Sequence, residues 1–158
     1  MGIRDIYLLS PELALVSLAL TIILLDLFIR NKVVLQAVAV VGLIVPLVLS
    51  AVIWQHLYTI PAQAEMAFFG SLLVDRLALF FKFLILVILV LLLLASGRYM
   101  ERFNRYQGEF IGLLFLSATG LMLLAAASDL ISIYLSLELA SLPIVALAAF
   151  SRNEVRSI

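Results

Sequence analysis

A single glutamate interrupts the last apolar run of this chain. Glu138 lies near the middle of Leu130 to Phe150, a run of 21 residues whose other polar members are three serines and one tyrosine. A helix over this run is about 31 Å long, which matches the hydrocarbon core of a bilayer. A carboxylate at that depth costs about 2.5 to 3.5 kcal/mol on insertion scales, so it is expected to face protein or water and to serve a function. We predict that Glu138 handles a proton or an ion.

The neighbours of Glu138 favour this interpretation. At helical spacing, Ser132, Ser136 and Ser141 are predicted to share its face and to form a polar stripe turned into a bundle. Pro143 lacks an N–H and therefore frees the backbone carbonyl four residues earlier, where water can bind. The alternative is a structural carboxyl that only hydrogen-bonds a nearby serine.

Lys82 is the next candidate, six residues into an apolar segment that begins near Leu77 or just before it. We favour a side chain that extends to the outer headgroups beside Asp75 and Arg76. The alternative is an inward-facing base that tunes a carboxylate on a neighbouring helix.

The other titratable residues have simpler interpretations. Glu12 and Asp129 stand in first helical turns, where a negative charge suits the helix dipole. Asp26 is predicted to pair with Arg30 one turn later. His56 is expected at the membrane surface rather than in a metal or proton site.

The composition is that of an integral membrane protein. Of 158 residues, 66% are hydrophobic and 13% are charged, and the net charge is zero. An ordinary soluble domain is about half apolar and a quarter charged. Without cysteine, the chain has no disulfide, thiolate metal site or cysteine-bound iron–sulfur cluster. Nothing indicates a nucleic-acid partner or a cofactor held by this chain, so redox chemistry is expected in partner subunits.

Five apolar segments are long enough to cross a bilayer, and without period-2 alternation they predict helices rather than a barrel. The fold class is therefore all-α, a polytopic transmembrane helical bundle within a single domain over residues 1–158. Gly112 and Gly120 give the fourth helix a small-residue surface for close packing. Ser10, Pro11 and Glu12 are predicted to start the first helix, with Ser10 as its N-cap. The predicted helices cover residues 11–29, 33–54, 77–96, 110–127 and 130–150.

The basic residues predict the orientation of these helices. One side of the membrane collects Arg30, Lys32, Arg98, Arg102, Arg105, Arg152 and Arg156. By the positive-inside rule that side is cytoplasmic and the N-terminus is outside, in a cell (inner or plasma) membrane. The outer connection from Gln55 to Leu73 is long enough to hold local structure of its own.

The residues from Gly108 to Phe150 resemble the fourth and fifth helices of subunit N of proton-pumping NADH-quinone oxidoreductase, respiratory complex I, an antiporter-like subunit family. The resemblance is carried by Ser128-Asp129-Leu130 and by the LELASL motif that contains Glu138. The motifs SPEL, LLDLF and VDRLALFFKFL, which begin at residues 10, 24 and 74, agree with it.

The resemblance implies that Glu138 pairs with a lysine of a later helix and helps to move a proton, and that Lys82 matches a lysine common in helix three. Family members have about fourteen helices, so we expect this chain to be an N-terminal fragment, with the partner lysine following Ile158. NAD, FMN, iron–sulfur clusters and quinone are implied in partner subunits, with other membrane-arm subunits and the lipid bilayer as direct partners.

The expected function is that of a non-redox membrane-arm subunit, part of an NADH:quinone oxidoreductase translocase, that couples quinone reduction to proton translocation. Two alternatives stay open: a cation/proton antiporter subunit of the same superfamily, and a structural membrane scaffold in which Glu138 only hydrogen-bonds.

Overall fold

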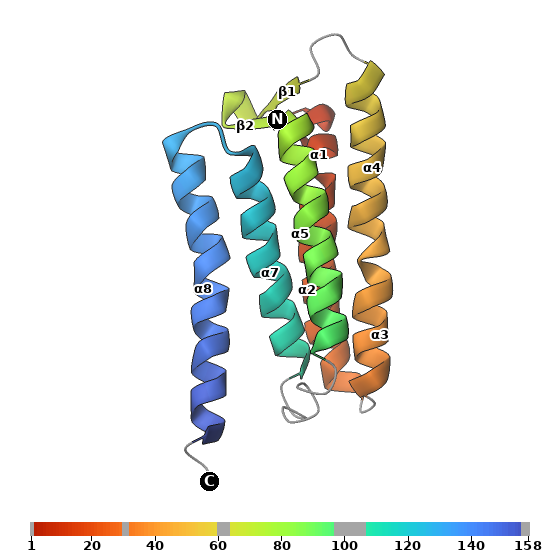
Figure 1. The fold of residues 1–158 in the computed structure, drawn as a ribbon, viewed down its shortest axis with the longest axis vertical. Coiled ribbons are helices and arrows are strands. Elements are labelled where there is room, and N and C mark those ends of the chain that lie inside the picture. The colour runs from red at the N-terminus through yellow and green to blue at the C-terminus, as the bar shows by residue number, and fades with distance from the viewer. Residues whose placement is uncertain (1, 30–31, 60–63, 97–106, 156–158) are drawn as a thin grey trace.

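Five long helices run side by side through the molecule, as expected from the apolar segments (Figure 1). The computed structural model describes residues 2–29, 32–59, 64–96 and 107–155. The helices able to span a membrane are α2 (Ser10–Phe28), α3 (Lys32–Gly42) continued by α4 (Ile44–Thr59), α5 (Arg76–Ala95), α7 (Gln107–Ala126) and α8 (Leu130–Val155). The prediction of an all-α polytopic bundle is confirmed.

The second span is divided at Leu43. Pro46 has no backbone N–H, so the carbonyl of Gly42 loses its helical partner and α3 ends there. Hydrogen bonds from Leu43 to Ala39 (3.2 Å) and from Leu47 to Leu43 (3.3 Å) keep the two pieces in line. The pair α3 and α4 therefore acts as one membrane-crossing element.

The connection from Gln55 to Leu73 was predicted to hold local structure, and the structure shows there a β-hairpin that extends to Asp75. Strand β1 (Ala64–Ala67) pairs antiparallel with β2 (Leu72–Asp75), with Ala64 opposite Asp75. The tip between the strands holds Phe68, Phe69 and Gly70 at positive φ. The hairpin lies across the same end of the bundle as the short N-terminal helix α1 (Ile3–Leu8), which the sequence did not predict (Figure 1).

The hairpin is also bound to the connection between α7 and α8. The backbone N–H of Ser128 donates a hydrogen bond of 3.0 Å to the carbonyl of Ser71, and its hydroxyl donates to the carbonyl of Gly70. Leu72 forms an isolated bridge with Ala127. One end of the bundle is thus closed by α1, the hairpin and the α7–α8 turn together.

Helix α7 is the central helix, in contact with α2, α5 and α8. A Cβ at Gly112 would stand 2.6 Å from the tip of Ile23 on α2, and one at Gly120 would stand 2.3 Å from the Ala140 nitrogen on α8. The predicted small-residue packing surface is therefore confirmed. By contrast, α8 contacts the bundle chiefly through α7 and lies at its edge (Figure 1).

The first long helix begins one residue earlier than the sequence predicts. The prediction that Ser10 caps the first helix is wrong, because α2 already includes Ser10 and Leu9 occupies the N-cap without a side-chain hydrogen bond.

The seven basic residues that predict the orientation lie outside the described side chains. The orientation therefore stays a prediction.

Candidate functional site

The start of α5 places Lys82 inside the bundle. The Asp75 carboxylate accepts a hydrogen bond of 2.7 Å from the Ala78 N–H and so caps the helix. Lys82 stands less than two turns further on, and its side chain is 1% exposed. The favoured expectation of a side chain extended to the headgroups is wrong, because Lys82 faces inward as the alternative requires. That Lys82 acts as a base and tunes a carboxylate stays a prediction.

The partner of Lys82 is Glu12, in the first turn of α2. The Lys82 Nζ lies 2.6 Å from Glu12 Oε1, and the Glu12 side chain is 2% exposed. Glu12 Oε1 has no hydrogen-bond partner among the described residues, so the contact is an ion pair held by charge. The interpretation of Glu12 as a residue that only suits the helix dipole is therefore incomplete.

The ion pair joins two helices that share their neighbours. Both α4 and α7 pack against α2 and also against α5. Side chains tilt toward the N-terminus of their helix, and both helices begin at the same end of the bundle. A lysine deep in α5 therefore reaches back toward a glutamate near the start of α2. This geometry was the signal in the sequence that could have found the pair.

Apolar side chains of α1 and the hairpin cover the pair at the end of the bundle where these two elements lie. Leu8 of α1 together with Ala67 and Val74 of the hairpin belong to a buried cluster, and Phe68 and Leu72 pack on it. All five line the recess that ends at Glu12 and Lys82. The hairpin and α1 thus cover the pair at this end of the bundle.

The carboxylate of Glu12 is incompletely satisfied within the described residues. Its Oε2 is buried without a hydrogen-bond partner, and so is the hydroxyl of Ser10. A buried ion pair repays its desolvation only when good geometry and further hydrogen bonds support it. Pairing by itself therefore does not explain why these two charges are buried here.

Glu138 is on the other side of the molecule, on the outward face of α8. The buried residues of α8 include Ser136, Ala140 and Pro143, and Ser136 and Ala140 each lie about 200° around the helix from Glu138. The prediction that Glu138 points into the bundle with Ser136 on its side is wrong for the described part of the chain. Its carboxylate is exposed and accepts a hydrogen bond from the hydroxyl of Tyr134.

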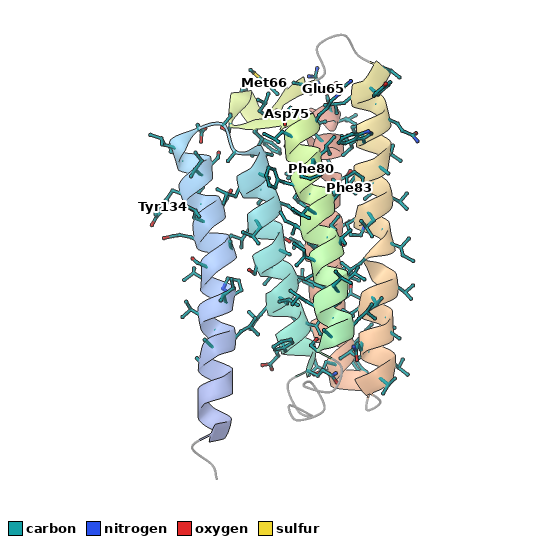
Figure 2. The ribbon with its side chains drawn as sticks, viewed as in Figure 1. Glu65, Met66, Asp75, Phe80, Phe83 and Tyr134 are labelled. Atoms are coloured by element: carbon teal, nitrogen blue, oxygen red, sulfur yellow. The ribbon has the colours of Figure 1, made fainter. Side chains whose placement is uncertain are left out.

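Tyr134 marks this outward face in Figure 2, where it points away from α7, and 59% of its surface is exposed. Tyr134 lies on the same side of α8 as Glu138, one turn earlier, and is its hydrogen-bond partner. The Ser141 hydroxyl approaches the Glu138 backbone carbonyl at 3.4 Å rather than the carboxylate. Leu135, Leu142 and Val145 make the rest of this face apolar.

Charged side chains also meet at the end of the bundle that carries the hairpin. Glu65 of β1, labelled in Figure 2, lies 2.9 Å from Arg4 Nε and 3.1 Å from His56 Nε2. The Tyr7 ring meets the His56 ring edge-on. Because Arg4 and His56 are well exposed, this cluster contributes little to stability. His56 lies in the last turn of α4, at the end of the bundle that carries the hairpin, and its position at the membrane surface stays a prediction.

The two remaining predictions concern aspartates. Asp129 accepts a 2.6 Å hydrogen bond from the Ser132 N–H, which confirms it as the residue that caps α8. That hydrogen bond, assisted by the hydroxyls of Ser132 and Ser71, lowers the pKa of Asp129. Asp26 lies against Gly108 of α7. Arg30, its predicted partner, is outside the described residues.

The amino-acid sequence of this chain is similar to those of known oxidoreductase subunits. The chain is 33% identical over 91% of its length to NADH-quinone oxidoreductase subunit N of Dehalococcoides mccartyi. It is 35% identical over 98% of its length to NADH-quinone oxidoreductase subunit N 1 of Koribacter versatilis. The chain is homologous to part of subunit N. The resemblance predicted from its motifs is confirmed.

The homology reaches beyond enzymes named for NADH. The chain is 32% identical over 98% of its length to F(420)H(2) dehydrogenase subunit N of Methanosarcina mazei. It covers 29%, 31% and 32% of the lengths of these three relatives, so it spans about a third of a subunit N. No protein-family model matches the chain.

The subunit N homology and the geometry bear differently on the two candidate residues. Glu138 belongs to the LELASL motif that carries the resemblance, and it lies on the outward face of α8. Lys82, by contrast, has a partner within the chain, and that partner, Glu12, belongs to the SPEL motif. The two motifs therefore place their carboxylates differently: Glu138 is exposed on the bundle surface and Glu12 is buried in an ion pair.

Proposed function

We propose that this chain is a membrane subunit of a quinone-reducing oxidoreductase and contributes to proton translocation coupled to quinone reduction. The observation that carries the proposal is a titratable carboxyl, Glu138, midway along an apolar helix in a homologue of subunit N. Such a group in a membrane span is rare and is functional by default.

In this proposal Glu138 takes up and releases a proton. Its position on the outward face of α8 supports contact with a neighbouring protein surface or a water path, because a carboxylate against acyl chains would lack partners. Tyr134 holds the carboxylate in one orientation. By its resemblance to the family, the group that faces Glu138 is a lysine of a later helix, which favours the charged form and tunes proton release.

Electron transfer belongs to other subunits in this proposal. The chain has no cysteine, and its relatives are named for two different electron donors, NADH and F(420)H(2). A subunit shared by both kinds of enzyme serves a step that follows the entry of electrons. NAD, FMN, iron–sulfur clusters and quinone would be bound by partner subunits, and this chain would contact other membrane-arm subunits and lipid.

The proposal is tested with the complex that contains this chain, reconstituted into proteoliposomes. Quinone reduction is expected to drive proton movement into or out of the vesicles, independently of sodium and abolished by a protonophore. If proton movement requires a sodium gradient, the chain is a cation/proton antiporter subunit. If quinone reduction moves neither ion, the chain is a scaffold and the proposal is wrong.

A further inference from the structure

We propose that Glu12 and Lys82 form a second proton-holding site of this chain, separate from Glu138. In its charged state the site is an ammonium beside a carboxylate. One proton then passes from Lys82 Nζ to the Glu12 carboxylate, which leaves a neutral amine beside a carboxylic acid, and the proton exchanges with water when the recess opens. The inference rests on the proposed function in proton translocation.

The distance and the burial make this transfer feasible. Nζ and Oε1 are 2.6 Å apart, so a small reorientation of either side chain aligns the donor and the acceptor for proton transfer. Both side chains are withdrawn from water, which penalises the two charges and narrows the free-energy difference between the charged and the neutral pair. In the Arg4–Glu65 pair, by contrast, the Arg4 side chain is 65% exposed, so water stabilises its charge.

The unsatisfied oxygen of Glu12 is the second observation. Within the described residues Oε2 has no hydrogen-bond partner although it is buried. An ion pair that serves only stability is supported by hydrogen bonds to its remaining oxygen. A carboxyl that becomes protonated needs that support less, because the neutral acid is far cheaper to bury than the carboxylate.

No other titratable side chain competes in the part of the recess that the structure describes. The recess is lined by Glu12, Lys82 and apolar residues of α1, the α1–α2 joint, the hairpin and α7. The nearest charged residues of these elements are engaged elsewhere: Asp5 accepts hydrogen bonds from the backbone of Gly2 and Phe68, and Glu65 pairs with Arg4 and His56. Asp75 caps α5.

The hairpin controls access to the site. Phe68 and Leu72 cover the pair from the outer end, and the closed recess leaves no room for water. Proton exchange with the aqueous phase therefore requires the hairpin to move. Because Ser128 bonds to the hairpin directly before α8 begins, that movement also involves the turn that leads to Glu138.

Two variants of the assembled complex separate a proton-holding site from a structural ion pair. Lys82→Arg keeps the positive charge, but a guanidinium does not release its proton. Glu12→Gln combined with Lys82→Met removes both charges and leaves no buried charge unpaired. Glu109→Gln, at an exposed acid in the first turn of α7, is the matched control.

We expect both variants to assemble and to lower the ratio of proton pumping to artificial-acceptor activity at least threefold, while the control keeps it. A wild-type ratio in either assembled variant overturns the second site. Glu138→Gln is measured in parallel: if it lowers the ratio and the Glu12 and Lys82 variants do not, only this inference fails. If none of them lowers the ratio, the proposed function itself is wrong.

A second measurement needs no variant to fold. Amine-reactive reagents attack a neutral amine, so Lys82 in the wild-type complex is expected to be modified severalfold faster during turnover than at rest, as read by mass spectrometry of the peptide that contains it. Equal labelling of Lys82 in both states overturns the proposal.

Discussion

Gly120 of α7 lies directly against the backbone of α8, where a Cβ would stand 2.3 Å from the Ala140 nitrogen. Ser117 lies one turn before Gly120 on α7, and its hydroxyl donates a 2.8 Å hydrogen bond to the Ala140 carbonyl of α8. These two contacts fix which face of α8 meets the bundle. Glu138, about 200° around the helix from Ala140, is consequently turned outward.

Gly120→Ala is expected to disturb this contact strongly. The new methyl group meets backbone atoms that cannot rotate away, so we expect destabilisation of about 1 to 3 kcal/mol. Gly112→Ala is the matched control, because its methyl group would clash only with the Ile23 side chain, which can change rotamer, and would lie at an ordinary 3.5 Å from the Ala19 carbonyl oxygen. The measurement is the thermal unfolding midpoint of the purified complex. Equal midpoints for the two variants would contradict the packing described.

Asp129 predicts a pH dependence at the start of α8. Its pKa is lowered by the hydrogen bond from the Ser132 N–H, so its contribution to folding is complete above the unfolded pKa of about 4 and is lost as pH falls through the lower folded value. Asn at this position still caps a helix but does not titrate. We expect Asp129→Asn to reduce the loss of stability between pH 5 and pH 3. An unchanged acid profile would show that Asp129 does not contribute.

The predicted orientation can be tested with single cysteines, since the natural chain has none. Met66→Cys in the hairpin is expected to react with an impermeant thiol reagent from outside the cell, because Met66 is 65% exposed near the predicted outer end. Asn104→Cys, in the connection between α5 and α7, is expected to react only from the cytoplasmic side. Labelling of both from one side would refute the five-span topology.

The sequence was sufficient to predict the spans but not the faces of the helices. Long apolar segments can only be membrane helices, so hydropathy located all five. In such helices, however, nearly every residue is apolar, and no polar face indicates which side is packed. Ser136 and Glu138 are two residues apart on α8 and face opposite ways. The face of α8 with Ser136 and Ala140 is buried, because Gly120 of α7 packs against the backbone at Ala140.

The Glu12–Lys82 pair was missed for a related reason. Each residue had a sufficient local explanation, a first-turn acid and a lysine near a helix end, and each explanation ignored the other helix. Only the arrangement of α2 and α5 at a common end of the bundle brings the two together. The hairpin and α1 were not predicted as elements because short strands and a six-residue helix leave little periodicity.

The most direct test of the proposed function is the ratio of proton pumping to artificial-acceptor activity in Glu138→Gln. The amide keeps the size and hydrogen bonding of the side chain but cannot titrate, so packing survives and proton handling does not. Glu138→Asp is the milder companion because the acid remains one methylene shorter, and Glu109→Gln is again the control.

The measurement uses membranes with equal amounts of assembled complex. We expect Glu138→Gln to lower the ratio about tenfold or more, in line with the usual contribution of a general acid or base, with artificial-acceptor activity unchanged and Glu138→Asp intermediate. A wild-type ratio in Glu138→Gln would mean that Glu138 is structural and would contradict the proposed role of this chain in proton translocation.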